Sequence, residues 1–255
     1  DLGTEYIIDL LNKFELSVDQ QKALSEYCRE QGILYMCTPW DSKSVDVLES
    51  FSVPAYKVAS ADLTNLPLLD KLSKTQKPLI LSTGMSSSKE IQISSNFLNN
   101  RKVDFAFLHC NSTYPAPLHD INLNWINKLK EIHPLVGYSG HERGINVTLA
   151  AVAIGAKVIE RHFTLDRMME GPDHAASLEI DEFSIMIKGI REIEEALGST
   201  DLKERALSQG EMINRENLGK SLVASKPLSK GTILRDEDIK VLSPGQGLSP
   251  QNYEA

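Results

Sequence analysis

Two histidines lie at the ends of neighbouring apolar runs of the sequence. His141 closes the segment Gly137–His141 (GYSGH), and His162 lies within Glu160–Asp166 (ERHFTLD). Imidazole suits Mn, Fe, Co, Ni or Zn, and two imidazoles leave coordination positions open for a substrate oxygen or water. The pattern predicts an open-sided metal site at His141 and His162. The alternative is that each ring caps a strand end by bonding to backbone or to a carboxylate.

A second set of side chains could hold a small dianion. It comprises hydroxyls, one amide and one ammonium group that follow different apolar runs: Thr38, Lys57, Ser60, Asn111 and Ser139. Donors of these kinds suit a phosphate group together with a carboxylate. Taken alone, a lysine such as Lys57 is more often solvated or ion-paired, so the prediction depends on the set.

The segment Gly171–Glu179 (GPDHAASLE) follows the last apolar run, where active-site loops collect. Asp173 and His174 could bind sugar hydroxyls there. The same residues are also compatible with a helix start near Glu179 that Ser177 caps. His109, inside an apolar run, is interpreted as a hydrogen-bonded structural histidine rather than a ligand.

Six short apolar runs must position these side chains. They are 33–40, 55–60, 78–85, 104–110, 135–141 and 158–165, and stretches with helical periodicity separate them. Capping-box spacing at Ser17–Gln20 and at Ser87–Glu90 predicts two helix starts. Gly32 predicts the end of the helix that begins near Ser17. Strands buried by crossover helices imply a parallel sheet.

The polar residues at the run ends favour a (β/α)₈ (TIM) barrel, which collects its chemistry from the carboxyl ends of many strands. A dinucleotide-binding sheet is disfavoured because no G-x-G-x-x-G motif is present. A closed barrel needs about eight units, so we expect the first two β/α units to be absent from this chain. The predicted barrel domain covers residues 1–198, a polar linker covers 199–216, and a small, mostly β domain, expected to be incomplete, covers 217–255.

The composition excludes some partners. Apolar residues make up 41% of the chain and charged residues 24%, with a net charge of −8. This charge argues against nucleic acid as a partner. No run approaches the roughly 20 apolar residues of a membrane span, and the N-terminus lacks the basic region of a signal peptide. Three cysteines without a disulfide pattern are typical of a reduced, cytoplasmic protein.

The sequence resembles the sialic acid synthase family, which includes N-acetylneuraminate, legionaminate and pseudaminate synthases. The matching segments occur in family order: CTPWD, YKVASADLTNLPLL, ILSTGM, HCNSTYPAP, GYSGHERG, GAKVIERHFTLD, GPDHAASLE and LGKSLVASKPLSKGTIL. The resemblance implies a TIM barrel followed by a small antifreeze-like (SAF) domain. It also implies condensation of phosphoenolpyruvate with an N-acylated amino sugar in a domain-swapped homodimer.

The resemblance implies roles for particular residues. His141 and His162 match the family's metal ligands, usually for Mn²⁺ or Mg²⁺. The set Thr38, Lys57, Ser60, Asn111 and Ser139 matches the groups around phosphoenolpyruvate. Tyr114 and Asp173 match the side that receives the sugar. Lys57, Ser139 and Asp173 are the expected catalytic residues.

One departure and two alternatives remain. Many bacterial members carry Arg-Pro-Gly in the SAF domain, and here Ser243 stands in place of that arginine. The sequence also allows a TIM-barrel hydrolase in which the histidine pair activates water. A third possibility is a non-catalytic binding protein of the SAF type.

Overall fold

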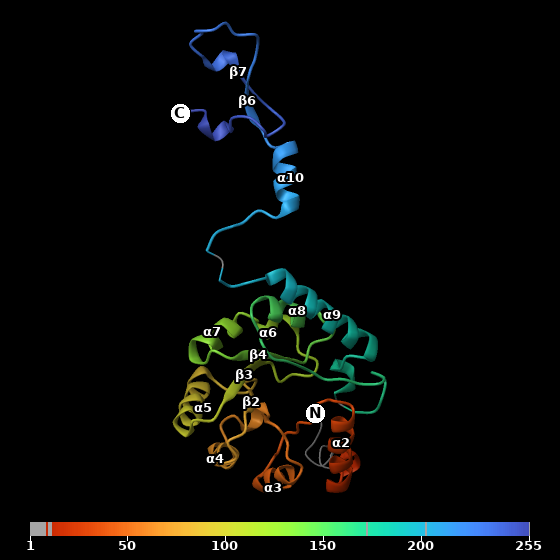
Figure 1. The fold of residues 1–255 in the computed structure, drawn as a ribbon. Coiled ribbons are helices and arrows are strands. Elements are labelled where there is room, and N and C mark those ends of the chain that lie inside the picture. Colours follow the sequence, from red (N-terminus) through yellow and green to blue (C-terminus); the bar gives the residue numbers. More distant parts are fainter. Residues whose placement is uncertain (1–8, 10–11, 172, 202, 255) are drawn as a thin grey trace. The chain divides into compact units, whose positions relative to one another are not determined.

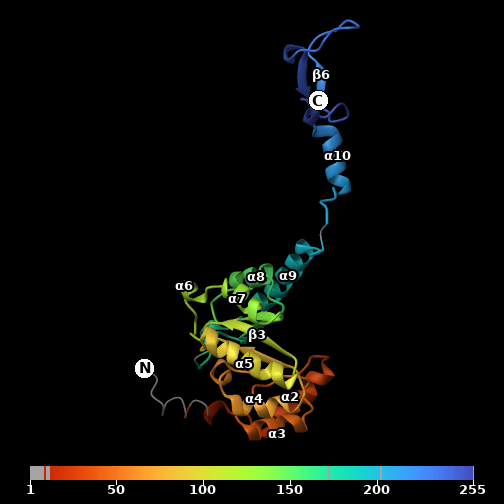
Figure 2. The same ribbon diagram turned by 90° about the vertical axis from the view of Figure 1, so that its left-hand side faces the viewer.

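A computed structural model describes residues 9, 12–171, 173–201 and 203–254, and it divides the chain into two compact units, 1–198 and 199–255. The first unit is an α/β structure (Figures 1 and 2). Most of the N-terminal segment considered for a leader sequence lies outside the described residues. No described helix has the length and apolar character needed to cross a membrane.

A parallel sheet forms the centre of the first unit. Within the described residues it has five strands in the order β1 (Tyr56–Val58), β2 (Leu79–Ser82), β3 (Phe105–Cys110), β4 (Val136–Gly140) and β5 (Ile159–Arg161). Each strand pairs with the next strand of the chain, so the connections run in one direction around a curved sheet. This is the partial barrel that the alternating strands and helices predict.

Helices cover the outer face of this sheet. They are α3 (Ser42–Ser50), α4 (Leu66–Ser73), α5 (Ser88–Arg101), α6 (Leu118–Ile121), α7 (Trp125–Ile132), α8 (Asn146–Ala153) and α9 (Ile180–Leu197). Figure 1 shows α4, α5 and α7 following one another around the strands. Side chains at alternate strand positions, such as Leu79, Phe107 and Tyr138, pack under the helices in the hydrophobic core. The intervening positions face the inside of the barrel.

Local chemistry sets the helix starts as predicted. Ser17 and Gln20 form a capping box at the start of α2 (Val18–Glu30), and Ser87 and Glu90 form one at the start of α5. Gly32 follows α2 with a φ of +71°, which glycine adopts without steric cost. The start of α9 differs from the prediction. Glu179 is its N-cap, whereas the Ser177 hydroxyl donates to the Asp173 carbonyl.

The first predicted strand, residues 33–40, is not a strand in the structure. Among the described residues, its backbone makes one hydrogen bond with β1, in which Cys37 O accepts from Lys57 N at 3.4 Å. A ladder needs repeated pairing along the strand. Ile33 and Leu34 are also largely exposed, at 64% and 77%. Apolar, β-rich composition without a partner on both sides was therefore not enough to form a strand.

The second unit contains a short two-stranded antiparallel sheet. Strands β6 (Ser221–Ala224) and β7 (Ile239–Leu242) pair, and Leu222 N also donates to Leu248 O. Helix α10 (Gln209–Leu218) lies mostly within the stretch predicted to be a linker. Ser208 caps that helix in a capping box with Glu211, a signal the polar composition of the stretch obscured. At the turn after β7, Ser243 accepts a hydrogen bond from Lys220 Nζ at 2.8 Å.

Candidate active site

The predicted metal ligands extend from the ends of two paired strands. The ladder between β4 and β5 ends with Gly140 opposite Arg161, and His141 and His162 are the residues that directly follow these two strands. Their ring centroids lie 5.2 Å apart at an angle of 73°. The structure therefore brings the two imidazoles together at the carboxyl end of the sheet, where a TIM barrel places its chemistry.

His141 is held in one tautomer. Its Nδ1 lies 2.6 Å from the backbone carbonyl oxygen of Asn111. This oxygen can only accept, so Nδ1 carries the proton and Nε2 keeps a free lone pair. The side chain is buried, and burial, with a smaller effect of His162, lowers the pKa of His141 below its usual value. The ring is therefore neutral near pH 7, the form that binds metals.

Tyr114 and Asp173 border the histidine pair. The Tyr114 ring lies 4.2 Å from the His141 ring and 5.5 Å from the His162 ring, centroid to centroid. Asp173 Oδ2 lies 3.7 Å from His162 Nδ1, and about half of the Asp173 side chain is exposed. Burial raises the pKa of Tyr114 to about 12, so its phenol stays protonated and can donate a hydrogen bond. These two side chains therefore offer a donor and an acceptor beside the histidines.

Lys57 and Ser139 meet at a carboxylate that sequence reasoning did not single out. Glu160 Oε1 accepts a hydrogen bond from Ser139 Oγ at 2.8 Å and lies 3.6 Å from Lys57 Nζ. The Lys57 side chain is 13% exposed, and burial lowers its pKa although Glu160 offsets part of that effect. Glu160 precedes His162 by two positions, so period-two alternation could have placed it on the same inner face.

Ser60 contacts the backbone after β2. Its hydroxyl accepts from Gly84 N at 3.1 Å and lies 3.8 Å from Cys110 Sγ. A Cβ at Gly84 would lie 2.3 Å from Ser112 Oγ and 3.0 Å from Ser60 Oγ, so only glycine permits this close approach. The carboxyl ends of β1, β2 and β3 thus converge on one cluster of small polar side chains.

Two predicted donors, the loop residue His174 and the β3 residue His109 have other contacts. The Asn111 amide donates to Asp120 O and its oxygen accepts from Thr113 N, so the side chain stabilises its own loop. Within the described residues, the Thr38 side chain makes no hydrogen bond to another predicted site residue. Further contacts are local: His174 Nδ1 lies 2.7 Å from Thr164 Oγ1, and His109 Nε2 lies 2.6 Å from Ile121 O.

The donor set fits a divalent metal with open coordination positions. His141 presents a free Nε2, and His162 lies beside it with its side chain about one-third exposed. Among the described residues, no group of three His, Cys, Asp or Glu side chains converges into a larger ligand cluster. Two imidazoles leave room for oxygen ligands from a substrate or water.

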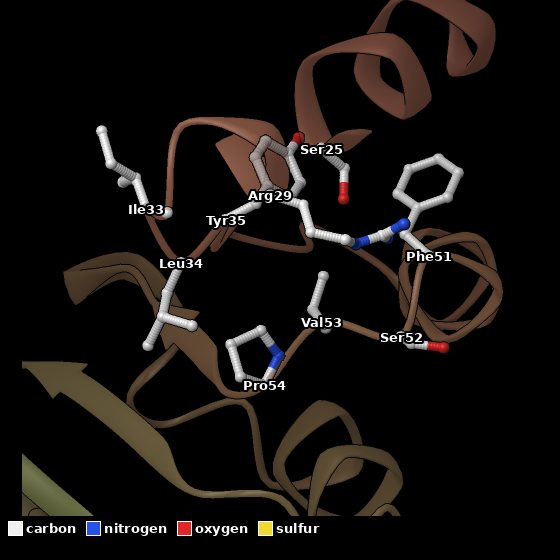
Figure 3. Close-up of a pocket in the computed structure, with 10 residues that line it drawn as sticks. Ser25, Arg29, Ile33, Leu34, Tyr35, Phe51, Ser52, Val53 and Pro54 are labelled. Carbon is white, nitrogen blue, oxygen red and sulfur yellow. The ribbon is translucent and has the colours of Figure 1, made fainter. Parts of the chain in front are cut away.

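Two cavities lie outside this histidine pair. One of about 300 Å³, between the ends of α2 and α3, is bordered by Arg29, Tyr35, Phe51 and Val53 (Figure 3). It adjoins the amino end of β1, the face of a barrel that does not carry chemistry. The other, of about 400 Å³, reaches from Thr83 and Cys110 to Trp125 and so adjoins the carboxyl ends of β2 and β3.

Comparison with known proteins shows the family of the chain. The NeuB family model matches residues 1–202, and the SAF domain model matches residues 219–255. The chain is 40% identical to N,N'-diacetyllegionaminic acid synthase of Campylobacter jejuni, covering 97% of this chain and 74% of the relative. It is 39% identical to human N-acetylneuraminate-9-phosphate synthase, covering 93% of this chain and 66% of that protein.

Solved structures agree with these relatives. The crystal structure of N-acetylneuraminic acid synthetase from Leptospira borgpetersenii, a citrate complex, superposes with a TM-score of 0.79 at 33% identity. The match covers 83% of this chain and 75% of that one. The chain is thus an enzyme of the sialic acid synthase type and belongs to the NeuB family.

Proposed function

We propose that the protein condenses phosphoenolpyruvate with the open-chain aldehyde form of an N-acylated amino sugar, N-acetylmannosamine or a relative. The products are a nonulosonic (sialic-type) acid and inorganic phosphate. The supporting observation is that Lys57 on β1 and Ser139 on β4 both contact Glu160 on β5, and that the paired histidines directly follow β4 and β5. The proposed anion donors and metal ligands therefore lie at the same end of the barrel, where the strands have their carboxyl ends.

The bonds of this reaction balance without a redox partner. C3 of phosphoenolpyruvate attacks the aldehyde carbon, so a C–C bond forms and the aldehyde oxygen becomes a hydroxyl group. Water adds at C2, and the C2–O bond to phosphate then breaks to leave a 2-keto acid. Lys57, Ser139 and Ser60 are the proposed donors that hold the phosphate and carboxylate and stabilise developing charge. Thr38 and Asn111 remain proposed contacts on the same side.

Tyr114 and Asp173 are the proposed contacts for the sugar, since they flank His141 and His162. Asp173 is also the proposed group that accepts or returns a proton at a sugar hydroxyl. Mn²⁺ or Mg²⁺ held by His141 and His162 would supply Lewis-acid polarisation of the aldehyde oxygen. Lys57, which pairs with Glu160, is the proposed group that orients the phosphoenolpyruvate relative to that oxygen.

A panel of acceptor sugars tests the proposal. The full-length protein is incubated with Mn²⁺, phosphoenolpyruvate and N-acetylmannosamine, its 6-phosphate, or the diacetamido precursors of legionaminic and pseudaminic acids. We expect phosphate and 2-keto acid to appear in equal amounts with at least one acceptor, and His119→Gln, an exposed histidine, to behave as wild type. Phosphate release without any sugar would support the hydrolase alternative, and absence of product with every acceptor would refute the synthase proposal.

We also propose that the protein acts as a homodimer in which residues 217–255 of one subunit cover the site of the other. The family resemblance supports this arrangement, with Ser243 at the position of the family arginine. Deletion of 217–255 is expected to abolish sugar-dependent turnover, and light scattering on the full-length protein is expected to give the mass of a dimer. A monomer that keeps full activity after the deletion would contradict the proposal.

A further inference from the structure

A fully buried ion pair joins the residues next to the two histidines. Glu142 directly follows His141, and Arg161 directly precedes His162. Arg161 Nη1 lies 2.9 Å from Glu142 Oε1, and both side chains have 0% exposure. This pair lies on the outer side of the strand ends, so it touches neither the proposed substrates nor the proposed metal.

The guanidinium of Arg161 binds several acceptors at once. Nη1 also donates to Gly144 O and to Thr148 Oγ1, both at 2.8 Å, and Nη2 donates to the Glu142 carbonyl at 2.6 Å. The other carboxylate oxygen of Glu142 accepts from the Tyr138 hydroxyl at 2.6 Å. Arginine makes such a multidentate set because its donors form a rigid planar fork, whereas a lysine ammonium acts as a point charge.

This network begins where the β-ladder stops. The last pair of the ladder between β4 and β5 is Gly140 opposite Arg161, so the ladder does not extend to His141 and His162. At Gly140 a Cβ would lie 2.7 Å from Glu142 Oε2 and 3.0 Å from Arg161 Cδ. The ion pair therefore packs directly against the backbone from which both histidines extend.

We propose that the Arg161–Glu142 pair positions His141 and His162 relative to each other, so that their two imidazoles can share one metal ion. The inference deepens the proposed function and rests on the metal role of the histidines. Buried ion pairs contribute little net stability compared with apolar packing, but their geometry is specific. Partners behind metal ligands set ligand orientation, and their loss weakens metal binding by about 10- to 100-fold.

Arg161→Lys tests the role of the guanidinium in the full-length protein. Lysine keeps the buried positive charge but has a single nitrogen on a shorter side chain, so it cannot replace both Nη1, which binds Glu142 Oε1, and Nη2, which binds the Glu142 backbone carbonyl. We expect the variant to fold and to bind Mn²⁺ about 10- to 100-fold more weakly than wild type. The affinity is measured without substrates, from the free Mn²⁺ signal in electron paramagnetic resonance, and folding is checked by circular dichroism and thermal unfolding.

A double variant guards against misfolding caused by a lone buried charge. Arg161→Met combined with Glu142→Gln removes both charges, and such neutral replacements often preserve stability. We expect it to lose Mn²⁺ affinity to a similar extent. The matched control is Arg101→Lys, because Arg101 donates to Asp70 from Nε at 2.9 Å and Nη2 at 2.7 Å, between α5 and α4. Its Mn²⁺ affinity is expected to stay at the wild-type value.

A second readout separates this inference from the proposed function. In wild type, nitrogen NMR of His141 is expected to show the Nδ1-protonated tautomer that bonds to Asn111, and a mixture of tautomers in the variants. If wild type binds no Mn²⁺, the metal part of the proposed function fails, and the NMR comparison alone decides the positioning role. Folded Arg161 variants with wild-type Mn²⁺ affinity would overturn the inference. So would an unchanged His141 tautomer in a protein without metal binding.

Discussion

Lys57 and Ser139 approach the same carboxylate, that of Glu160, from two different strands. The site therefore keeps its ammonium group beside a counter-charge, and burial still lowers the pKa of Lys57 because desolvation is the larger effect. Glu160 was within reach of sequence reasoning because His162 lies two positions further along the same strand. The contact to Lys57 was not, because it links residues about a hundred positions apart.

Lys57→Met removes the ammonium group but keeps a side chain of similar length. We expect kcat/KM for phosphoenolpyruvate to fall by at least about 100-fold, or about 2.7 kcal/mol, because the developing charge loses a preorganised donor. Steady-state phosphate release measures the change. Lys71→Met is the control, since Lys71 pairs with Asp46 at the protein surface. Equal kcat/KM values for Lys57→Met and wild type would remove Lys57 from the proposed site.

Tyr138 makes alkaline stability a test of the buried network. Burial, together with Glu142, raises the pKa of Tyr138 above its usual value of 10.0. The folded protein therefore keeps a proton that the unfolded chain releases, and the resulting stability is present below about pH 10 and is lost as the pH rises further. Tyr138→Phe is expected to be less stable by about 1.5–3 kcal/mol at neutral pH, because Glu142 loses a donor.

The same variant is expected to lose stability less steeply above about pH 10 than wild type does. Urea unfolding at a series of pH values measures both effects. Tyr27→Phe, which alters an exposed phenol, is the control and is expected to follow the wild-type curve. Parallel curves for Tyr138→Phe and wild type at alkaline pH would contradict the raised pKa.

At the scale of elements, the sequence predicted helices better than strands. Ser17 with Gln20 and Ser87 with Glu90 marked helix starts because a capping box is local chemistry between residues three positions apart. Segment 33–40 was predicted to be a strand from its apolar composition. A strand forms only when neighbouring strands pair with it along its length. The residues of this segment do not show that it makes a single backbone hydrogen bond with β1.

In the candidate site, too, some features could be predicted from the sequence and others depended on distant partners. The histidine pair was predictable because both residues end neighbouring strands, and parallel strands bring their carboxyl ends to one edge. The Arg161–Glu142 pair was not singled out, although both residues flank the histidines in sequence. Charged residues at such positions are usually solvated, and full burial is a property of the surrounding helices and strands rather than of the motif.

Gly137 tests how closely β4 and β5 must approach. A Cβ at this position would lie 2.2 Å from Val158 O and 2.5 Å from Leu108 Cδ2. Gly137→Ala is therefore expected to lower the free energy of unfolding by about 1–3 kcal/mol through overpacking. Thermal and urea unfolding measure the loss. Gly210→Ala, in open space within α10, is the control and is expected to gain about 0.5–1 kcal/mol. An unchanged stability for Gly137→Ala would show that the strands can separate.

At the scale of the whole molecule, the chain consists of two units, and the described residues 198–201 and 203–208 form neither helix nor strand. Lys203 and Arg205 in this segment are exposed. We expect trypsin to cut there first, because a protease needs an extended, accessible backbone. Mass spectrometry of the early products identifies the site, and Lys203→Gln with Arg205→Gln is expected to slow the cut. First cuts within residues 18–197 would contradict this expectation.

The alternation of side chains along β4 and β5 limits which insertions and deletions these strands tolerate. His141 and Ser139 lie in one row and Glu142 and Tyr138 in the other, because strand side chains alternate between the two faces. Inserting or deleting one residue within 137–142 would exchange the two rows and direct the histidine away from its partner. A substitution in this stretch changes one contact, whereas a change of length moves every later side chain to the opposite face. Length variation is therefore expected in the exposed loops rather than in β4 itself.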